Sequence, residues 1–200
     1  MDLAVIGITF GAIFLVELPD KTFIAALVLS TRYRPLLVWI GVGLAFGVQT
    51  VVAVTAGALV TLLPDAVIKS VAAAIFLIGA VLLFRTAPSA DAEEQEAEQE
   101  YAARATESKT GLKAVGAAFL VLFAAEWGDL SQLLTISLVA RYEAPVSVFI
   151  GALSALLLVS GLAVIAGRTL LRFVALHVLH YVGAAVCLLL AALTLAELLR

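Results

Sequence analysis

Residues 14–25 read FLVELPDKTFIA, which places Glu17 and Asp20 three residues apart inside an apolar segment. The pair recurs 109 positions further on, as Glu126 and Asp129. A carboxylate inside hydrocarbon costs about 2.5 to 3.5 kcal/mol on insertion scales. A chain that carries two such pairs of carboxylates is expected to use them to bind or move something. Transport of a cation is therefore the first hypothesis.

The composition is that of an integral membrane protein. Of the 200 residues, 64% are hydrophobic and 14% are charged, and the mean hydropathy is +1.15, whereas soluble domains are roughly 45 to 50% apolar. The net charge of −3 comes from an acidic cluster between positions 91 and 107, so there is no basic footprint for nucleic acid. The single cysteine, Cys187, excludes a disulfide framework and a thiolate metal cluster.

Six apolar segments reach the roughly 20 residues that a transmembrane helix needs. We expect an all-α integral membrane protein with a three-helix repeat at 1–84, an acidic linker at 85–112 and a second three-helix repeat at 113–200. The middle of the linker is rich in Ala, Glu and Gln and shows no apolar face, so a solvated segment is favoured over a cation antenna or a regulatory segment. The expected spans are approximately 3–30, 36–63, 67–84, 113–140, 145–167 and 174–198.

The two triplets resemble each other beyond the acidic pairs. Arg32 and Arg141 keep the offset of 109, and Gly41 and Gly151 then align at 110. We interpret this as an internal duplication. Because each unit has an odd number of spans, the second enters the membrane from the opposite side, which gives two inverted three-helix repeats with a site near the midplane.

Basic residues predict the orientation, because they favour the cytoplasmic side. The face that includes the linker is the richer in them, so we expect a cytoplasmic linker and both termini outside. A short chain that shows no targeting segment favours a bacterial plasma (inner) membrane. The basic residues on the linker face are Arg32, Arg34, Arg85, Arg104, Lys109, Lys113, Arg168 and Arg172. Those on the opposite face are Lys69, Arg141 and Arg200.

The four acidic residues are expected to converge. Glu17 lies about 21 Å into the first span at 1.5 Å per residue, and Glu126 lies similarly deep. The spacing i, i+3 places each Glu with its Asp, Asp20 or Asp129, on one face of a helix. In an inverted pair the two faces can meet. Four crowded carboxylates cannot all stay ionised without a cation, so we expect some to take up protons when the ion leaves.

The neighbours of the acidic pairs offer mainly oxygen. A helix breaker precedes each Asp, Pro19 in the first copy and Gly128 in the second. Thr22, Ser131 and Gln132 follow as supporting polar residues. Oxygen ligands suit Mg²⁺, Ca²⁺ and Mn²⁺, whereas Zn²⁺ and copper favour His or Cys.

Other polar residues in the spans have two interpretations each. Lys21 either neutralises a carboxylate of the empty site or turns away toward a polar cavity. Gln49 and Ser160 are secondary ligands or, more commonly, helix-packing contacts. His177 and His180 are expected at the membrane edge, where an interfacial or hydrogen-bonding role outweighs metal binding.

Residues 17–22 and 126–131 resemble the E-x-G-D-[KR]-[TS] signature that occurs twice in the Gdt-one-like family of manganese/calcium:proton exchangers. The resemblance covers essentially the whole chain. It implies an antiporter that exports Mn²⁺, or alternatively Ca²⁺, from the cytosol in exchange for protons, with no permanently bound cofactor. The implied metal ligands are Glu17, Asp20, Glu126 and Asp129, supported by Thr22, Ser131 and Gln132.

The sequence departs from the signature at three positions. Pro19 replaces a Gly, Leu130 replaces a basic residue, and Phe23 stands where a Gln often follows. Leu130 removes a positive charge beside the site, which bears on cation affinity and proton coupling.

Three rival functions compete with manganese export. One is a Ca²⁺:proton antiporter. A second is an intramembrane hydrolase with Asp20 and Asp129 as an acid/base dyad, which leaves Glu17 and Glu126 without a role. A third is a non-transporting membrane scaffold. We predict a transporter rather than an enzyme, whose partners are a divalent cation and the lipid bilayer. Homo-oligomerisation is left open, because small residues such as Gly41 can pack helices within or between subunits.

Overall fold

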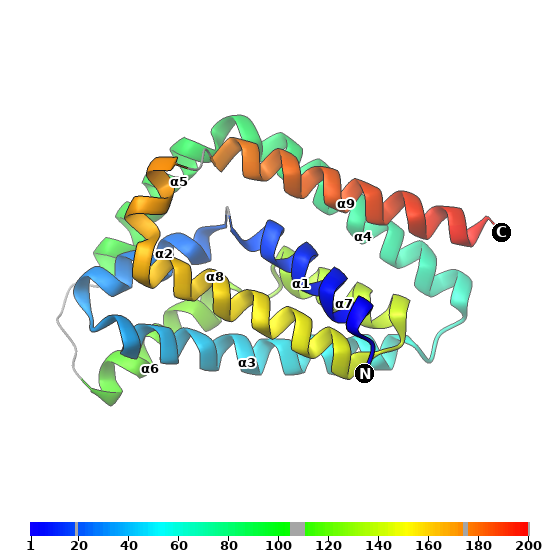
Figure 1. The fold of residues 1–200 in the computed structure, drawn as a ribbon, viewed down its shortest axis with the longest axis horizontal. Coiled ribbons are helices and arrows are strands. Elements are labelled where there is room, and N and C mark those ends of the chain that lie inside the picture. The colour runs from blue at the N-terminus through cyan, green and yellow to red at the C-terminus, as the bar shows by residue number, and fades with distance from the viewer. Residues whose placement is uncertain (19, 105–110, 174–175, 200) are drawn as a thin grey trace.

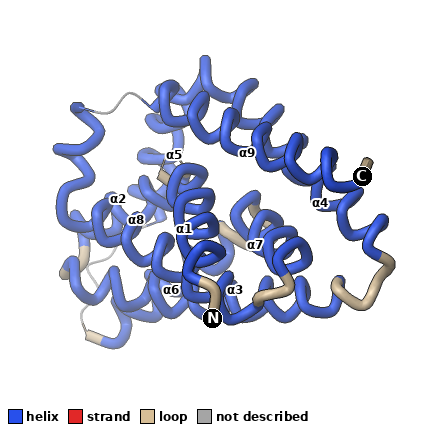
Figure 2. Tube along the Cα trace, turned by 45° about the vertical axis from the view of Figure 1, so that its right-hand side comes forward, coloured by secondary structure: helices blue, strands red, loops and turns tan. Residues whose placement is uncertain are grey.

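The structure is a computed structural model that describes residues 1–18, 20–104, 111–173 and 176–199. The described chain is helical, with short connecting loops (Figure 1, Figure 2). The elements are α1 (Leu3–Glu17), α2 (Lys21–Arg32), α3 (Pro35–Val60), α4 (Asp65–Thr86), the 3₁₀ turn η1 (Ala87–Ser89), α5 (Ala90–Arg104), α6 (Leu112–Ala125), α7 (Leu130–Tyr142), α8 (Pro145–Phe173) and α9 (Leu176–Leu198).

The described residues contain four continuous candidate spans, and six if each of two bent helix pairs counts as one span. The helices α3, α4, α8 and α9 are each long and apolar enough to cross a membrane. Two more spans are bent pairs, with α1 and α2 at 69° and α6 and α7 at 72°. The prediction of six spans is confirmed when each bent pair is counted as one span, and the spans predicted at 3–30 and 113–140 are each divided by a bend. The fifth span, expected at 145–167, is longer than predicted, because α8 continues to Phe173.

Each bend falls at an acidic motif. The helix α1 ends at Glu17 and α2 begins at Lys21, and α6 and α7 separate at the corresponding place. Gly128 has a φ of +81°, in the left-handed region that favours glycine. The predicted helix break at Gly128 is therefore confirmed, and Pro19, the predicted breaker of the first motif, lies outside the described residues.

The two halves pack against each other in the same way. Gly41 of α3 lies so close to α6 that a Cβ on it would be 2.4 Å from the carbonyl oxygen of Val115. Gly151 of α8 lies against α1, where a Cβ would be 2.7 Å from the carbonyl oxygen of Ile6. Ile6 and Val115 are themselves 109 positions apart. The second span of each half, α3 or α8, thus packs on the first half-helix of the other half, as expected for two inverted repeats.

A pair of stacked phenyl rings occurs in both halves. The ring centroids of Phe10 and Phe14 on α1 are 5.7 Å apart, and those of Phe119 and Phe123 on α6 are 5.4 Å apart. Both pairs have an interplanar angle of 12°. The duplication therefore extends from backbone packing to side-chain packing.

The two ends of the bundle differ. Both termini lie at one end and α5 lies toward the other, while α4 and α9 run side by side along one edge (Figure 1). At the end with the termini, the backbone N–H of Asp2 donates to Oγ of Ser147 at 2.9 Å. This contact ties the start of the chain to the start of α8.

The linker folds onto the bundle instead of lying apart from it. The helix α5 packs against α2, and Ala90, Ala97 and Tyr101 are buried. Their spacing places them on one side of a helix. The expectation that this stretch has no apolar face is therefore wrong.

Candidate metal centre

The four motif carboxylates meet at one place. Glu17, Asp20, Glu126 and Asp129 each offer an oxygen atom, and these four atoms all lie within 4.8 Å of one another. Each Glu stands at the end of a first half-helix, and each Asp directly precedes a second half-helix. The structure thus brings all four predicted ligands together from both halves of the chain.

The two aspartates are held by the starts of α2 and α7. Oδ1 of Asp20 accepts from the backbone N–H of Lys21 at 2.6 Å, and Oδ1 of Asp129 accepts from the backbone N–H of Gln132 at 3.0 Å. These are N-cap contacts, and they bring the positive ends of the two helix dipoles to the carboxylates. The placement of each Glu with its Asp on one helix face, expected from the i, i+3 spacing, is wrong, because the predicted break separates the two residues.

The two motif hydroxyls also contact motif carboxylates. Thr22 donates from Oγ1 to Oε2 of Glu17 at 2.9 Å. Ser131, its counterpart, donates from Oγ to Oδ2 of Asp129 at 2.7 Å. Both predicted supporting hydroxyls therefore lie at the site. In the first motif the hydroxyl contacts the Glu, whereas in the second motif it contacts the Asp.

Two carboxylate oxygens at the site have no hydrogen-bond partner among the described residues. They are Oε1 of Glu17 and Oε2 of Glu126. The two residues are 0% and 4% exposed. A buried charged group that lacks a partner costs at least about 1 to 3 kcal/mol, and such groups call for a specific explanation. The two oxygens are suited to accept a cation or a proton.

Gln132 stabilises the bend of the second motif. Its Oε1 accepts from the backbone N–H of Gly128 at 2.9 Å, while its own backbone N–H caps onto Asp129. The side-chain oxygen of Gln132 thus bonds to the backbone at the bend and stabilises it. The Nε2 atom is buried and has no partner in the described part of the chain.

A cavity of about 380 Å³ adjoins the carboxylates. Residues from the site and residues from the linker end share its wall, so it connects the carboxylates with the end of the molecule where α5 lies. The lining includes Asp20, Glu126 and Asp129 from the site, Thr86 from the end of α4, and Ala90 and Tyr101 from α5.

His180 and Tyr101 are cavity residues that the sequence interpretation missed. His180 of α9 is 7% exposed and lines the cavity beside the aspartates, although an interfacial position was expected. Its orientation depends on which face of α9 turns inward, and the sequence carries no direct signal for that. Tyr101 is the one aromatic residue of α5 and lies four positions after Ala97, which is a usable sign of a buried face.

The two motifs differ in charge at the cavity wall. Lys21 and Leu130, which follow the two aspartates, both line the cavity. Lys21 is exposed, and no ion pair among the described residues joins it to a motif carboxylate. Both alternatives for Lys21 therefore stay open: it lines the cavity, and it lies next to Asp20, whose carboxylate accepts from its backbone N–H.

Gln49 and Ser160 lie in the helix packing, and neither lines the cavity. Nε2 of Gln49 donates to the carbonyl oxygen of Phe123 on α6 at 3.0 Å. Oγ of Ser160 donates to the carbonyl oxygen of Leu157 within its own helix at 3.2 Å. The Gln49 contact agrees with the packing interpretation, and the Ser160 hydroxyl is satisfied within its own helix.

The fold and the carboxylate cluster define a multi-pass membrane protein with a buried acidic site between two related halves. Residues 5–91 and 114–200 match the family described as divalent cation/proton antiporter GDT1. The chain belongs to this family, whose members are transporters and not enzymes. The gap between the two matched ranges falls in the linker.

Several curated proteins are similar to this chain. It is 34% identical to protein PAM71, chloroplastic, of Arabidopsis thaliana, over 94% of this chain and 56% of that protein. It is 29% identical to GDT1-like protein 1, chloroplastic, of Oryza sativa subsp. indica, over 96% and 61% of the two chains. It is 37% identical to GDT1-like protein sll0615 of Synechocystis, over 64% and 66%. The chain therefore spans 56% to 61% of the length of the two chloroplastic relatives. No solved structure matches it significantly.

Proposed function

We propose that this protein exchanges a divalent cation for protons across a membrane, and that the cation binds among Glu17, Asp20, Glu126 and Asp129. The observation that carries the proposal is the pair of buried, unpartnered carboxylate oxygens on Glu17 and Glu126, placed within one four-carboxylate cluster. A divalent cation supplies the positive partner that these two oxygens lack. Family membership supports the same reaction.

The donor set favours a hard cation. The four carboxylates, together with the hydroxyls of Thr22 and Ser131, form an all-oxygen environment, which suits Mn²⁺, Ca²⁺ and Mg²⁺. We propose Mn²⁺ as the principal substrate, on the resemblance of the two motifs, with Ca²⁺ as the second candidate. Protons replace the departing cation, because four carboxylates this close repel one another when all are ionised.

Access to the site is proposed to alternate between the two ends of the bundle. The cavity lies between the carboxylates and the α5 end, and this supports an access path on the linker side. The excess of basic residues favours a cytoplasmic linker and outward termini. The bacterial plasma membrane predicted from the sequence finds no support in relatives whose names include chloroplastic, so we propose the orientation alone.

Proteoliposomes test the proposal. We expect Mn²⁺ uptake driven by an imposed pH gradient, loss of at least tenfold of that uptake in Glu17→Gln and Glu126→Gln, and normal uptake in Glu96→Gln. Glu96 is an exposed glutamate on α5, so this variant controls for the chemical change. The proposal fails if neither Mn²⁺ nor Ca²⁺ moves in the wild type, or if the two site variants transport normally.

A further inference from the structure

His180 places an imidazole nitrogen on the wall of a cavity whose predicted metal ligands are carboxylate oxygens. The residue lies on α9, is 7% exposed, and lines the same cavity as Asp20, Glu126 and Asp129. Its ring is not part of the set of four whose oxygens lie within 4.8 Å of one another. His180 therefore stands beside the cluster, on the cavity side of it.

The same cavity holds an unsatisfied buried acceptor. Oε2 of Glu126, a residue only 4% exposed, has no hydrogen-bond partner among the described residues. The wall that His180 joins thus already contains an oxygen that calls for a cation. Asp20 and Asp129 add carboxylates on the same wall.

An imidazole changes which cations such a wall prefers. Ca²⁺ and Mg²⁺ bind almost entirely through oxygen. First-row transition-metal ions also accept imidazole nitrogen. One histidine among carboxylates therefore adds more to the binding of first-row transition-metal ions, with Mn²⁺ gaining least among them, than to the binding of Ca²⁺ or Mg²⁺.

We propose that His180 is a specificity-determining residue, which donates a ring nitrogen to a cation held in this cavity by Asp20 and Asp129 and thereby favours first-row transition-metal ions over Ca²⁺ and Mg²⁺. This inference rests on the proposed function, because it assigns a selectivity to the same cation pathway.

The chain contains a matched control for this proposal. His177 lies three positions earlier on α9, is exposed, and does not line the cavity. These two are the only histidines among the 200 residues. A nitrogen signal from histidine that persists in His177→Gln is therefore assigned to His180, even if His180→Gln does not fold.

The test uses the full chain, purified without a histidine tag and loaded with manganese(II) chloride. Pulsed electron paramagnetic resonance of bound Mn²⁺ detects coupling to a ligand nitrogen, and labelling of histidine with ¹⁵N identifies its source. We expect the coupling in the wild type and in His177→Gln, and its loss in His180→Gln. Competition binding should show the Mn²⁺-over-Ca²⁺ affinity ratio reduced about tenfold in His180→Gln and unchanged in His177→Gln.

The outcomes separate this inference from the proposed function. A wild type that binds Mn²⁺ without histidine-nitrogen coupling overturns the role of His180 and leaves the carboxylate site intact. A folded His180→Gln protein that keeps the wild-type Mn²⁺-over-Ca²⁺ affinity ratio also overturns the role of His180. A wild type that binds neither Mn²⁺ nor Ca²⁺ overturns the proposed function and this inference with it.

Discussion

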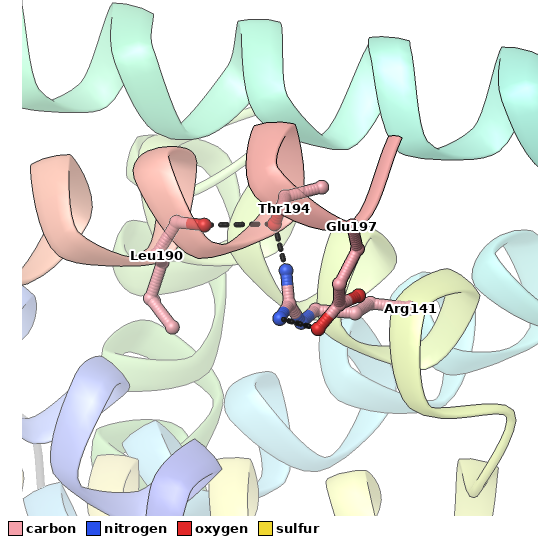
Figure 3. Close-up of polar contacts among 4 residues, drawn as sticks. All are labelled: Arg141, Leu190, Thr194 and Glu197. Carbon is pink, nitrogen blue, oxygen red and sulfur yellow. Dashed lines mark hydrogen bonds and ion pairs between the residues drawn. The ribbon is translucent and has the colours of Figure 1, made fainter. Parts of the chain in front are cut away.

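Nη2 of Arg141 lies 2.8 Å from Oε1 of Glu197, and this ion pair ties the end of α7 to the end of α9 (Figure 3). The same guanidinium donates through Nη1 to Oγ1 of Thr194, whose hydroxyl donates to the carbonyl oxygen of Leu190 at 2.7 Å. The Arg141 side chain is 6% exposed and that of Glu197 is 50% exposed. The end of the bundle remote from the linker is therefore fastened by a partly buried ion pair, while the cavity lies toward the α5 end.

Removal of Glu197 is expected to cost more stability than removal of Arg141. Glu197→Ala leaves a buried guanidinium without its charged partner, whereas Arg141→Met leaves a carboxylate that water can reach. We expect Glu197→Ala to lower the free energy of unfolding by about 1 to 2 kcal/mol, less than a fully buried pair would lose because Glu197 is half exposed. Thermal unfolding in detergent measures this, with Glu96→Ala as an exposed control. Equal melting temperatures for Glu197→Ala and Glu96→Ala would contradict the expectation.

The close approach of the two repeats at Gly41 and Gly151 predicts a matched pair of destabilised variants. A Cβ at either position meets a backbone carbonyl, at 2.4 Å and 2.7 Å respectively, and a backbone atom cannot rotate away. We expect Gly41→Ala and Gly151→Ala each to cost about 1 to 3 kcal/mol. At Gly47 on α3, no atom lies within 4 Å of the place that a Cβ would occupy, so Gly47→Ala should leave the melting temperature unchanged or raise it. A Gly41→Ala protein as stable as Gly47→Ala would show that α3 and α6 do not pack this closely.

Gly128→Ala is expected to weaken cation binding through the backbone alone. The position has open space around it but a φ of +81°, and an L-residue in left-handed conformation costs about 1 to 2 kcal/mol. Relief of that strain moves Asp129, the next residue, away from the other carboxylates. We expect reduced Mn²⁺ affinity by equilibrium binding, with Gly11→Ala on α1, another position with open space, as the control. Wild-type affinity in Gly128→Ala would mean that the bend does not depend on this glycine.

Much of the fold could be predicted because hydropathy and repetition act over whole segments. The apolar runs give the number of spans, and the acidic pairs at a fixed offset indicate the duplication that Gly41 and Gly151 display in three dimensions. The bends were harder to predict, because an apolar run has the same hydropathy whether its helix is straight or broken. Only Pro19 and Gly128 hinted at them. The docking of α5 was missed because it depends on three residues spread through an acidic helix.

The candidate site was predictable in its charges and less so in its walls. Buried carboxylates in hydrocarbon are costly enough to stand out, so Glu17 and Glu126 were evident from the sequence. His180 was not, because its place in the cavity depends on how α9 is rotated against the rest of the bundle. Gln49 and Ser160 illustrate the reverse case, since a polar residue at mid-span satisfies a neighbouring carbonyl as readily as it binds an ion.

Lys21 is expected to weaken cation binding by repulsion. Lys21 lines the cavity, and at a separation of ~8 Å in water the repulsion between a unit charge and a divalent cation is about 1 kcal/mol. Lys21→Gln should therefore raise Mn²⁺ affinity roughly fivefold at low salt. The substitution keeps the backbone N–H that caps onto Asp20. The gain should shrink in about 1 M salt, where the Debye length is about 3 Å.

Lys69→Gln is the matched control for Lys21→Gln. Lys69 lies near the start of α4 and does not line the cavity, so its neutralisation should leave the affinity unchanged at every salt concentration. Titration of Mn²⁺ into the three proteins at low and high salt makes the comparison. If Lys21→Gln and Lys69→Gln bind alike, or if the gain persists in high salt, the two motifs do not differ electrostatically in the way that Lys21 and Leu130 imply. A salt-sensitive gain confined to Lys21→Gln would show that the first motif holds the cation less strongly than the second.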